Sequence, residues 1–247
     1  MPASRNDLSE DRPAVSFRSF FKFRLPFSAP RNRGSRRDWP ESNAPETVFT
    51  HFYRTNRWRD RNSRSGRGSN LLQTEVIRQA VPRLIRDLGC KSLVDAPCGD
   101  FFWMSRVELE VECYWGVDIV AALVENNQTN YGNDVRHFLK LDILSDSLPN
   151  GDLVLCRDCL VHFPHADVFR ALRNFRASGS VYLLTTTFTA RHRNADIALG
   201  RWRPLNLQAD PFCFPPPLRL INEGCTEHRG RYADKSLGLW KLADLTL

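Results

Sequence analysis

Carboxylates stand at the ends of three strand-like stretches of the chain. Asp95 closes the apolar stretch SLVD, Asp118 closes YWGVD, and Asp142 follows LKL. In an open α/β sheet, ligands bind beyond the carboxyl ends of parallel strands, so we expect these three side chains at one edge. An edge with this much acid favours a cationic ligand over a pyrophosphate.

The loop after Asp95 departs from the usual nucleotide-binding pattern. A G-x-G-x-x-G loop uses several glycines to bring backbone amides close to phosphates, whereas this loop carries Pro97, Cys98 and a single glycine, Gly99. Gly99 lets a ligand approach the backbone without a Cβ in the way. Pro97 fixes its own φ near about −65° and has no N–H. We therefore expect a turn preorganised by proline, and the missing glycines disfavour a nicotinamide-dependent oxidoreductase.

The spacing of the carboxylates indicates a nucleoside. Asp118 lies nineteen residues after Gly99, and a strand-end carboxylate at about this distance accepts both hydroxyls of an adenosine ribose. Asp142 is placed to accept a hydrogen bond from an adenine amino group, and Ile143 is placed to pack against the ring. For Asp95 two roles stay open: it binds an amino group of the ligand, or it hydrogen-bonds the amides of the loop.

Three polar residues follow a fourth strand-like stretch, in DLVLCRDCLVHF. Arg157 and Asp158 either pair with each other or line a substrate pocket, and Asp158 is a candidate general base by position. His162 precedes Pro164, which suits the first turn of a helix. It either caps that helix or accepts a proton from the substrate.

The elements that must position these residues alternate between helix and strand from Asn70 onward. The patterns predict helices at 71–89, from about 101, at 120–130 and at about 164–176, and strands at 92–96, 112–117, 136–141, 152–156, 180–186, 218–223 and 236–244. Alternation of this kind indicates a mostly parallel sheet with helices on both faces. The last two strands, joined by a short segment, read as an appended antiparallel hairpin. The predicted fold is thus a Rossmann-like α/β sheet of seven strands.

Two segments flank the predicted site. Residues 193–212 form an insertion after the fifth strand, and we expect this insertion to be a substrate lid through Trp202, Arg203 and Asn206. Arginines and tryptophan there suit an anionic or sugar-like acceptor. The segment SGRGSNLLQT, at 65–74, offers amides and hydroxyls that suit a carboxylate, and it reads equally well as a flexible hinge.

Composition indicates a reduced, cytosolic protein. No apolar run of the 247 residues approaches the roughly 20 needed to span a bilayer. The seven cysteines are odd in number and follow no secretory signal. Cys156 and Cys159 have metal-like spacing but lack two further ligands, so we expect buried, inert thiols and no metal.

The positive charge is concentrated at the N-terminus. Residues 1–70 hold 15 Lys+Arg against 7 Asp+Glu, a net of +8 within a total of +7, so the remainder is close to neutral. We expect a disordered basic arm at 1–45 and one catalytic domain at 46–247. The aromatic and basic stretch 17–27 either contacts an anionic surface or nucleic acid weakly, or docks on its own domain. The neutral body disfavours a nucleic-acid track on the catalytic domain.

These motifs resemble the class I S-adenosylmethionine-dependent methyltransferases. LVDAPCGDF is similar to their first motif, with Pro97 and Phe101 at two glycine positions, and GVDIV, LDI…LP and DLVLCRDCLVHF are similar to the second, third and fourth. More narrowly, YRTNRW, SGRGS and DAPCGDFFWM resemble a largely uncharacterised bacterial subfamily. The resemblance implies S-adenosylmethionine as cofactor, held by a set of loop residues: Asp95, Pro97, Cys98, Gly99, Asp118, Ile119, Asp142 and Ile143.

The resemblance also implies a reaction. Methyl transfer to an oxygen or nitrogen of a small-molecule acceptor mainly needs alignment and exclusion of water, with a base where the acceptor is a hydroxyl. Candidates for the catalytic residues are Asp158, His162 and Arg157. The alternative is a catalytically silent methyltransferase-like domain that binds a partner through its basic arm.

Overall fold

The computed structural model describes residues 39–40 and 42–247. The predicted arm at 1–45 therefore lies mostly outside the described residues. Its last part does not: the compact unit begins at Trp39, which packs edge-to-face on Phe52 at 5.3 Å between ring centroids. In the described part of the chain, no helix is long and apolar enough to cross a membrane.

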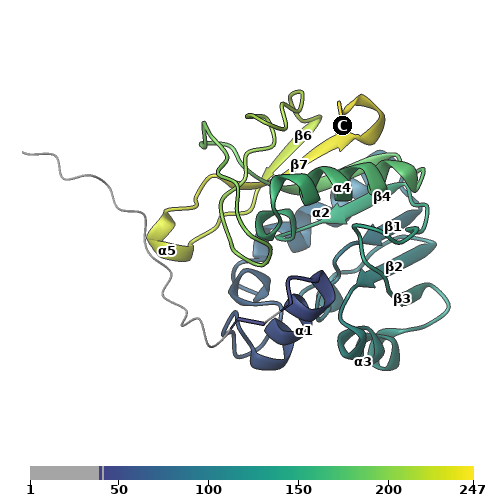
Figure 1. The fold of residues 1–247 in the computed structure, drawn as a ribbon. Coiled ribbons are helices and arrows are strands. Elements are labelled where there is room, and N and C mark those ends of the chain that lie inside the picture. Colours follow the sequence, from purple (N-terminus) through teal and green to yellow (C-terminus); the bar gives the residue numbers. More distant parts are fainter. Residues whose placement is uncertain (1–38, 41) are drawn as a thin grey trace, which may run out of the picture. The chain divides into compact units, whose positions relative to one another are not determined.

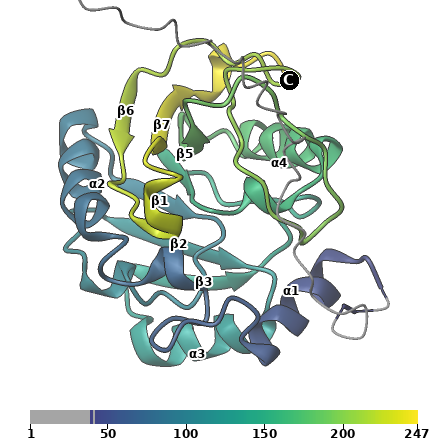
Figure 2. The same ribbon diagram turned by 90° about the vertical axis from the view of Figure 1, so that its left-hand side faces the viewer.

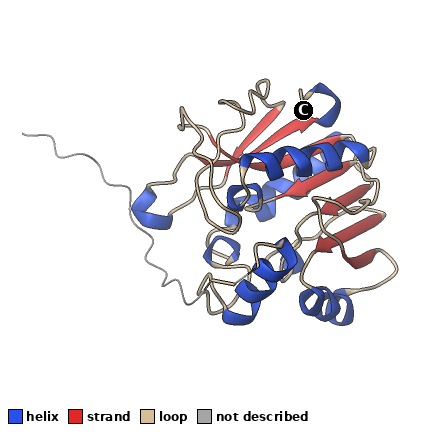
Figure 3. Ribbon diagram, in the orientation of Figure 1, coloured by secondary structure: helices blue, strands red, loops and turns tan. Residues whose placement is uncertain are grey.

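A seven-stranded sheet forms the centre, as predicted (Figures 1 and 3). Its strands are β1 (Ser92–Asp95), β2 (Cys113–Asp118), β3 (Arg136–Lys140), β4 (Leu153–Cys156), β5 (Tyr182–Phe188), β6 (Arg219–Asn222) and β7 (Lys235–Lys241), in the order β3-β2-β1-β4-β5-β7-β6. The first five are parallel, and β7 runs antiparallel to both β5 and β6. Because β1 lies between β2 and β4, the winding reverses beside β1, which is where ligands bind in such sheets.

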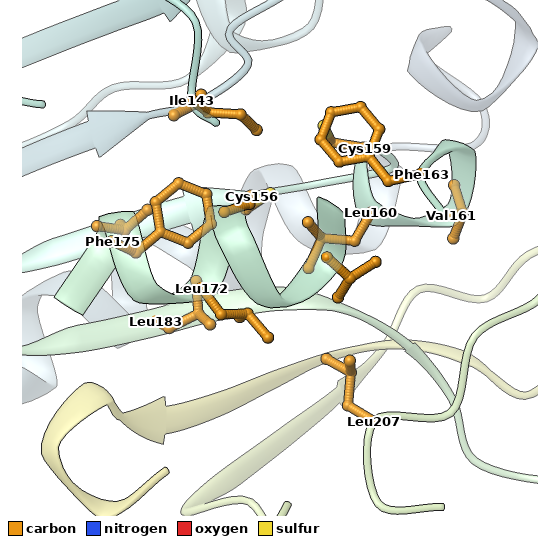
Figure 4. Packing of buried hydrophobic residues seen from close by; sticks show 14 of the residues in the cluster. Ile143, Cys156, Cys159, Leu160, Val161, Phe163, Leu172, Phe175, Leu183 and Leu207 are labelled. Atoms are coloured by element: carbon orange, nitrogen blue, oxygen red, sulfur yellow. The ribbon is translucent and has the colours of Figure 1, made fainter. Parts of the chain in front are cut away.

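Helices cover both faces of the sheet (Figure 2). They are α1 (Pro45–Thr55), α2 (Glu75–Leu88), α3 (Ala121–Tyr131), α4 (His165–Ala177) and the short α5 (Glu227–Gly230). The apolar sides of α2 and α3 pack in one core cluster, while those of α1 and α4 pack in a second cluster on the opposite face. Figure 4 shows the second cluster, in which Leu172 and Phe175 of α4 meet Leu183 of β5 and Cys156 of β4.

The helix predicted from about residue 101 is wrong. Phe101 has a φ of +56°, which is outside the range of a right-handed helix, so no helix can begin at this residue. Its ring is buried against Tyr114 and Phe138. A single 3-10 turn, Met104–Arg106, follows in place of the helix. Burial of the bulky residues of FFWM thus outweighs local helix propensity.

One helix, α1, was not predicted from the sequence. α1 starts at Pro45, a favourable first position for proline, and ends at Asn56 in the left-handed region with φ +46°. It buries Val48 and Phe52, one turn apart. The helix brings the segment between α1 and α2 to the carboxyl ends of the strands.

Candidate active site

The loop after β1 is hydrogen-bonded to the end of β2. The Gly99 amide donates to Oδ2 of Asp118 at 3.2 Å, and the Val120 amide donates to Oδ1 at 3.0 Å. Burial raises the pKa of Asp118 to about 6, against the lowering effect of these amides. No cation contacts this carboxylate among the described residues. The pair is therefore an acceptor site with uncompensated negative charge.

Asp95 lies beneath this pair and faces the core. Its carboxyl accepts a hydrogen bond from the Tyr114 hydroxyl at 2.6 Å, and within residues 42–247 it makes none to the loop amides. Burial raises the pKa of Asp95 to about 7, and the charge of nearby Asp118 adds to the increase. Two carboxylates with raised pKa values thus adjoin each other where the winding reverses.

The DAPCGD loop is held from several sides. The Cys98 amide donates to the carbonyl of Val117 at 2.8 Å, and Asn127 of α3 donates to the carbonyl of Gly99 at 2.8 Å. Cys98 is buried, and desolvation raises the pKa of its thiol well above the usual range. Pro97 is half-buried and follows a cis peptide bond. Cys98 is thus an inert thiol that fixes the loop by its backbone.

Gly99 is required by packing as well as by conformation. Its φ of +57° lies in the left-handed region, and a Cβ there would stand 2.3 Å from Oγ of Ser65. Ser65 and Ser63 donate to the Asp100 carboxylate at 3.1 Å each, and the Arg64 amide donates to it at 2.6 Å. The segment before α2 therefore sits directly on the DAPCGD loop. Sequence reasoning missed Asp100, although its place after Gly99 marked it as part of the same loop.

The end of β3 supplies a polar and an apolar side chain, as expected. Asp142 is half-exposed, and its Oδ1 accepts the Leu144 amide at 2.9 Å. Oδ2 has no hydrogen-bond partner in the described part of the chain. Ile143 is buried in the core cluster beside it, and half-buried Ile119 packs on the opposite face. Asp142 thus keeps one carboxylate oxygen free to bind a ligand.

Four charged side chains form a closed cluster at the ends of β4, β6 and β7. The Arg157 guanidinium contacts Glu223 at 2.6 Å and Asp158 at 3.3 Å. The Lys235 ammonium contacts Asp158 at 2.6 Å and Glu223 at 3.3 Å. The charges cancel within the cluster, and Arg157 also donates to the carbonyl of Gly68 at 2.8 Å. Arg157 and Asp158 therefore pair with each other, the first of the two roles left open by the sequence.

This cluster weakens Asp158 as a base. Burial alone would raise its pKa, but Lys235 and Arg157 outweigh that effect and lower the pKa to about 2. A carboxylate this acidic takes a proton poorly near neutral pH. Glu223 and Lys235, which complete the cluster, lie 66 and 77 residues from their partners, so no local pattern indicated them.

His162 has the geometry of a proton acceptor. Its Nδ1 lies 3.0 Å from the carbonyl of Arg201, so Nδ1 carries the proton and Nε2 keeps its lone pair. Burial lowers the pKa of His162 to about 4, and the ring is therefore neutral at pH 7. It packs beside the Trp58 ring at 5.8 Å. The first amide of α4, that of His165, donates to the Asp196 carboxylate at 2.8 Å, so the capping role predicted for His162 is filled by another side chain.

The insertion after β5 is anchored by two of the three predicted lid residues. Arg203 is buried and donates to the carbonyls of Ala195, Leu160 and Phe163. Asn206 is buried and donates to the carbonyl of Arg191 at 2.7 Å. Trp202 is 41% exposed and packs edge-to-face against Tyr232. Trp202 is thus the predicted lid residue with surface left for a substrate.

The proteins to which this chain is similar are methyltransferases. No protein-family model matches the chain. Uncharacterized methyltransferase Rv0089 of Mycobacterium tuberculosis is 26% identical over 149 residues, which cover 54% of this chain and 74% of the relative. The narrower bacterial subfamily remains a prediction.

Two solved structures show the same architecture. The methyltransferase domain of bacterial CtHen1 matches with a TM-score of 0.52 and 13% identity, over 70% of this chain and 98% of that domain. The N-methyltransferase NodS of Bradyrhizobium japonicum, crystallised with S-adenosyl-L-homocysteine, matches with a TM-score of 0.55 and 11% identity, over 77% and 97%. The chain therefore has the Rossmann-like fold of the S-adenosylmethionine-dependent methyltransferases.

Proposed function

We propose that this protein transfers a methyl group from S-adenosylmethionine to an oxygen or nitrogen of a small-molecule acceptor. The observation that carries the proposal is the pairing of Gly99 with Asp118 beside the switch point of this fold. The methyltransferase names of the relatives and neighbours support it.

The strand-end residues fit the cofactor. Each oxygen of Asp118 accepts one backbone amide and keeps capacity for a ribose hydroxyl. The spare oxygen of Asp142 would accept from the adenine amino group, with Ile143 beside the ring. The uncompensated charge of Asp95 and Asp118 suits a cation. When bound, the cofactor supplies an electrophilic methyl group on a sulfonium.

His162 is the base that we assign for a hydroxyl acceptor. Its Nε2 is unprotonated at neutral pH, whereas Asp158 is held ionised by Lys235. Arg157 acts through the buried cluster as a positioning residue. Around them, Trp202 and the anchored insertion would exclude water from the acceptor.

The proposal is tested first by cofactor binding. Isothermal titration of the full chain with S-adenosylmethionine should give saturable binding, and no heat at about millimolar cofactor would contradict the proposal. Transfer of a labelled methyl group into a low-molecular-weight cell extract then tests turnover.

The silent binding module stays the alternative. It predicts cofactor binding without transfer to any extract, together with partner binding that is lost when residues 1–38 are deleted. Transfer that survives this deletion would exclude it, because none of the proposed site lies in that segment.

A further inference from the structure

An arginine-rich loop lies between α1 and the DAPCGD loop. Residues 54–67 contain six arginines and a single acidic residue, Asp60. The sequence analysis counted this charge with the basic N-terminus, but residues 54–67 lie within the domain predicted at 46–247 and contact its DAPCGD loop. The basic loop therefore belongs to the surroundings of the candidate active site.

Three of these arginines have no protein partner. The side chains of Arg59, Arg61 and Arg64 are exposed, and none forms a hydrogen bond or ion pair with a residue in 39–40 or 42–247. Asp60 does not neutralise them. Its Oδ1 accepts the amides of Asn62 and Ser63 at 2.8 and 3.0 Å, which shapes the turn.

Burial would raise the pKa of Asp60, but these amide bonds outweigh it and lower the pKa. Asp60 is therefore committed to the turn in its ionised form. The guanidinium groups of Arg59, Arg61 and Arg64 are therefore available to an external ligand.

The loop forms an open hollow of about 490 Å³ on the surface. Its lining consists of Thr55, Asn56 and residues 59–64, and every one of these side chains is polar. Polar and charged side chains in the lining favour a polar ligand, since binding pockets for apolar ligands are lined mostly by hydrophobic residues. Guanidinium groups pair best with phosphate or carboxylate oxygens, often through two parallel hydrogen bonds.

The same loop contacts both parts of the candidate active site. Ser63 and the Arg64 amide bind Asp100 of the DAPCGD loop, while the Trp58 ring packs beside His162. Two residues that line the hollow, Ser63 and Arg64, therefore contact the cofactor loop, and the loop's contact with the base is made by Trp58, next in the chain to the lining residue Arg59.

We propose that Arg59, Arg61 and Arg64 bind a phosphate group carried by the methyl acceptor. The assignment to the acceptor rests on the proposed function; the anion site itself does not. Nucleic acid fits less well, because stacking on bases needs accessible aromatic rings and Trp58 is packed between Phe52 and His162. The hollow is also compact, whereas a nucleic-acid strand tracks along an extended basic groove.

The test compares two triple variants of the full chain. R59Q/R61Q/R64Q removes the hollow's charge, and R83Q/R219Q/R229Q removes the same charge from three exposed arginines elsewhere. Isothermal titration at low salt uses inorganic pyrophosphate as the probe, followed by S-adenosylmethionine. We expect pyrophosphate affinity to fall about tenfold or more in the first variant and less than about twofold in the second. Cofactor affinity should stay within about twofold of wild type in both.

Several results would overturn the proposal. Absence of pyrophosphate binding to the wild type, or equal losses in both variants, would mean that the hollow holds no anion specifically. A parallel loss of cofactor affinity would place the arginines at the cofactor's carboxylate instead. Tighter binding of a single strand of about 12 nucleotides, lost in the same variant, would indicate nucleic acid. If pyrophosphate binds as expected but cofactor does not bind to any form, the anion site stands and the proposed function fails.

Discussion

Buried charges are balanced in one half of the strand-end edge, at β4, β6 and β7, and are not balanced in the other half, at β1 and β2. At β1 and β2, Asp95 and Asp118 are buried with neutral hydrogen-bond donors as their partners, and both pKa values are raised. At β4, β6 and β7, two acids and two bases contact one another and cancel. Among the described residues no cation forms an ion pair with Asp95 or Asp118, although the charge of Arg157 acts on Asp95 from the second half, whose four charges pair with one another.

The difference in charge indicates that the first half binds a ligand and that the second half stabilises the fold. Buried carboxylates without cations cost free energy in the folded protein, so their presence at the switch point is best explained by a cationic ligand. The balanced cluster instead ties β4 to the C-terminal hairpin and to Gly68 of the segment before α2. We therefore expect the acidic half to govern cofactor affinity and the balanced half to govern stability.

The largest effect should come from Asp118. D118A removes two charged hydrogen bonds to the ribose, each worth about 1.5–3 kcal/mol, so cofactor affinity should fall at least about 100-fold. Isothermal titration measures this loss, and D134A, at an exposed aspartate, is the matched control. Affinity within about twofold of wild type in D118A would remove Asp118 from the cofactor site.

Glu223 should show the reverse behaviour. Removing one partner of a buried ion pair leaves the other charges unbalanced and costs about 3–5 kcal/mol. E223A should lose that much free energy of unfolding in urea titrations, while cofactor affinity changes less than about twofold. E110Q, which breaks an exposed pair with Arg86, should cost below about 1 kcal/mol. A loss of cofactor affinity in folded E223A would contradict the view that the balanced half affects stability alone.

Much of the acidic half was predictable from sequence, and little of the balanced half was. The positions of Asp95, Gly99 and Asp118 follow from local strand patterns and from the rule that parallel strands end at one edge. The contacts of Arg157 with Glu223 and of Asp158 with Lys235 join residues far apart in the chain. Such pairs depend on how the hairpin packs, which local periodicity does not encode.

The two errors in the predicted helices have different causes. The pattern FFWM suits a helix locally, but its side chains are drawn into the core and Phe101 adopts a positive φ. α1 went unnoticed because it is short and stands beside basic residues, although Pro45 with Val48 and Phe52 is a helical signal. Tertiary burial decided the first outcome, whereas the second was a local signal that the sequence analysis overlooked.

The two halves should also respond differently to pH. Asp95 has a folded pKa of about 7 against an ordinary 3.8, so the folded state binds its proton more tightly than the unfolded state does. This contribution to stability is fully present below about pH 4 and is lost as the pH rises to about 7, by up to about 4 kcal/mol. Asp158, with a pKa of about 2, contributes stability that is lost only on acidification below about pH 4.

Urea titrations at several pH values between 4 and 8 measure this dependence. Wild-type stability should fall as the pH rises through that range, and D95N should flatten the slope, because asparagine cannot ionise but still accepts from Tyr114. Asp118, whose pKa is also raised, contributes a slope of the same sign. His162, whose pKa is lowered to about 4, contributes a slope of the opposite sign, so D95N should leave little net dependence on pH. An unchanged slope in D95N would mean that Asp95 is not an uncompensated carboxylate.

The smallest effect should come from Trp202, at the border of the balanced half. Its neighbour Arg203 is fixed by three backbone carbonyls, so the backbone that carries Trp202 is held in place while its ring stays 41% exposed. W202A should therefore lower methyl transfer about tenfold by loosening the acceptor site, with cofactor affinity and melting temperature nearly unchanged. W202F keeps an aromatic edge toward Tyr232 and should retain most of the activity. If W202A instead weakens the cofactor, the insertion faces the acidic half. If transfer is unaltered, the insertion is no lid, and the acceptor must be held by His162 and the arginine loop.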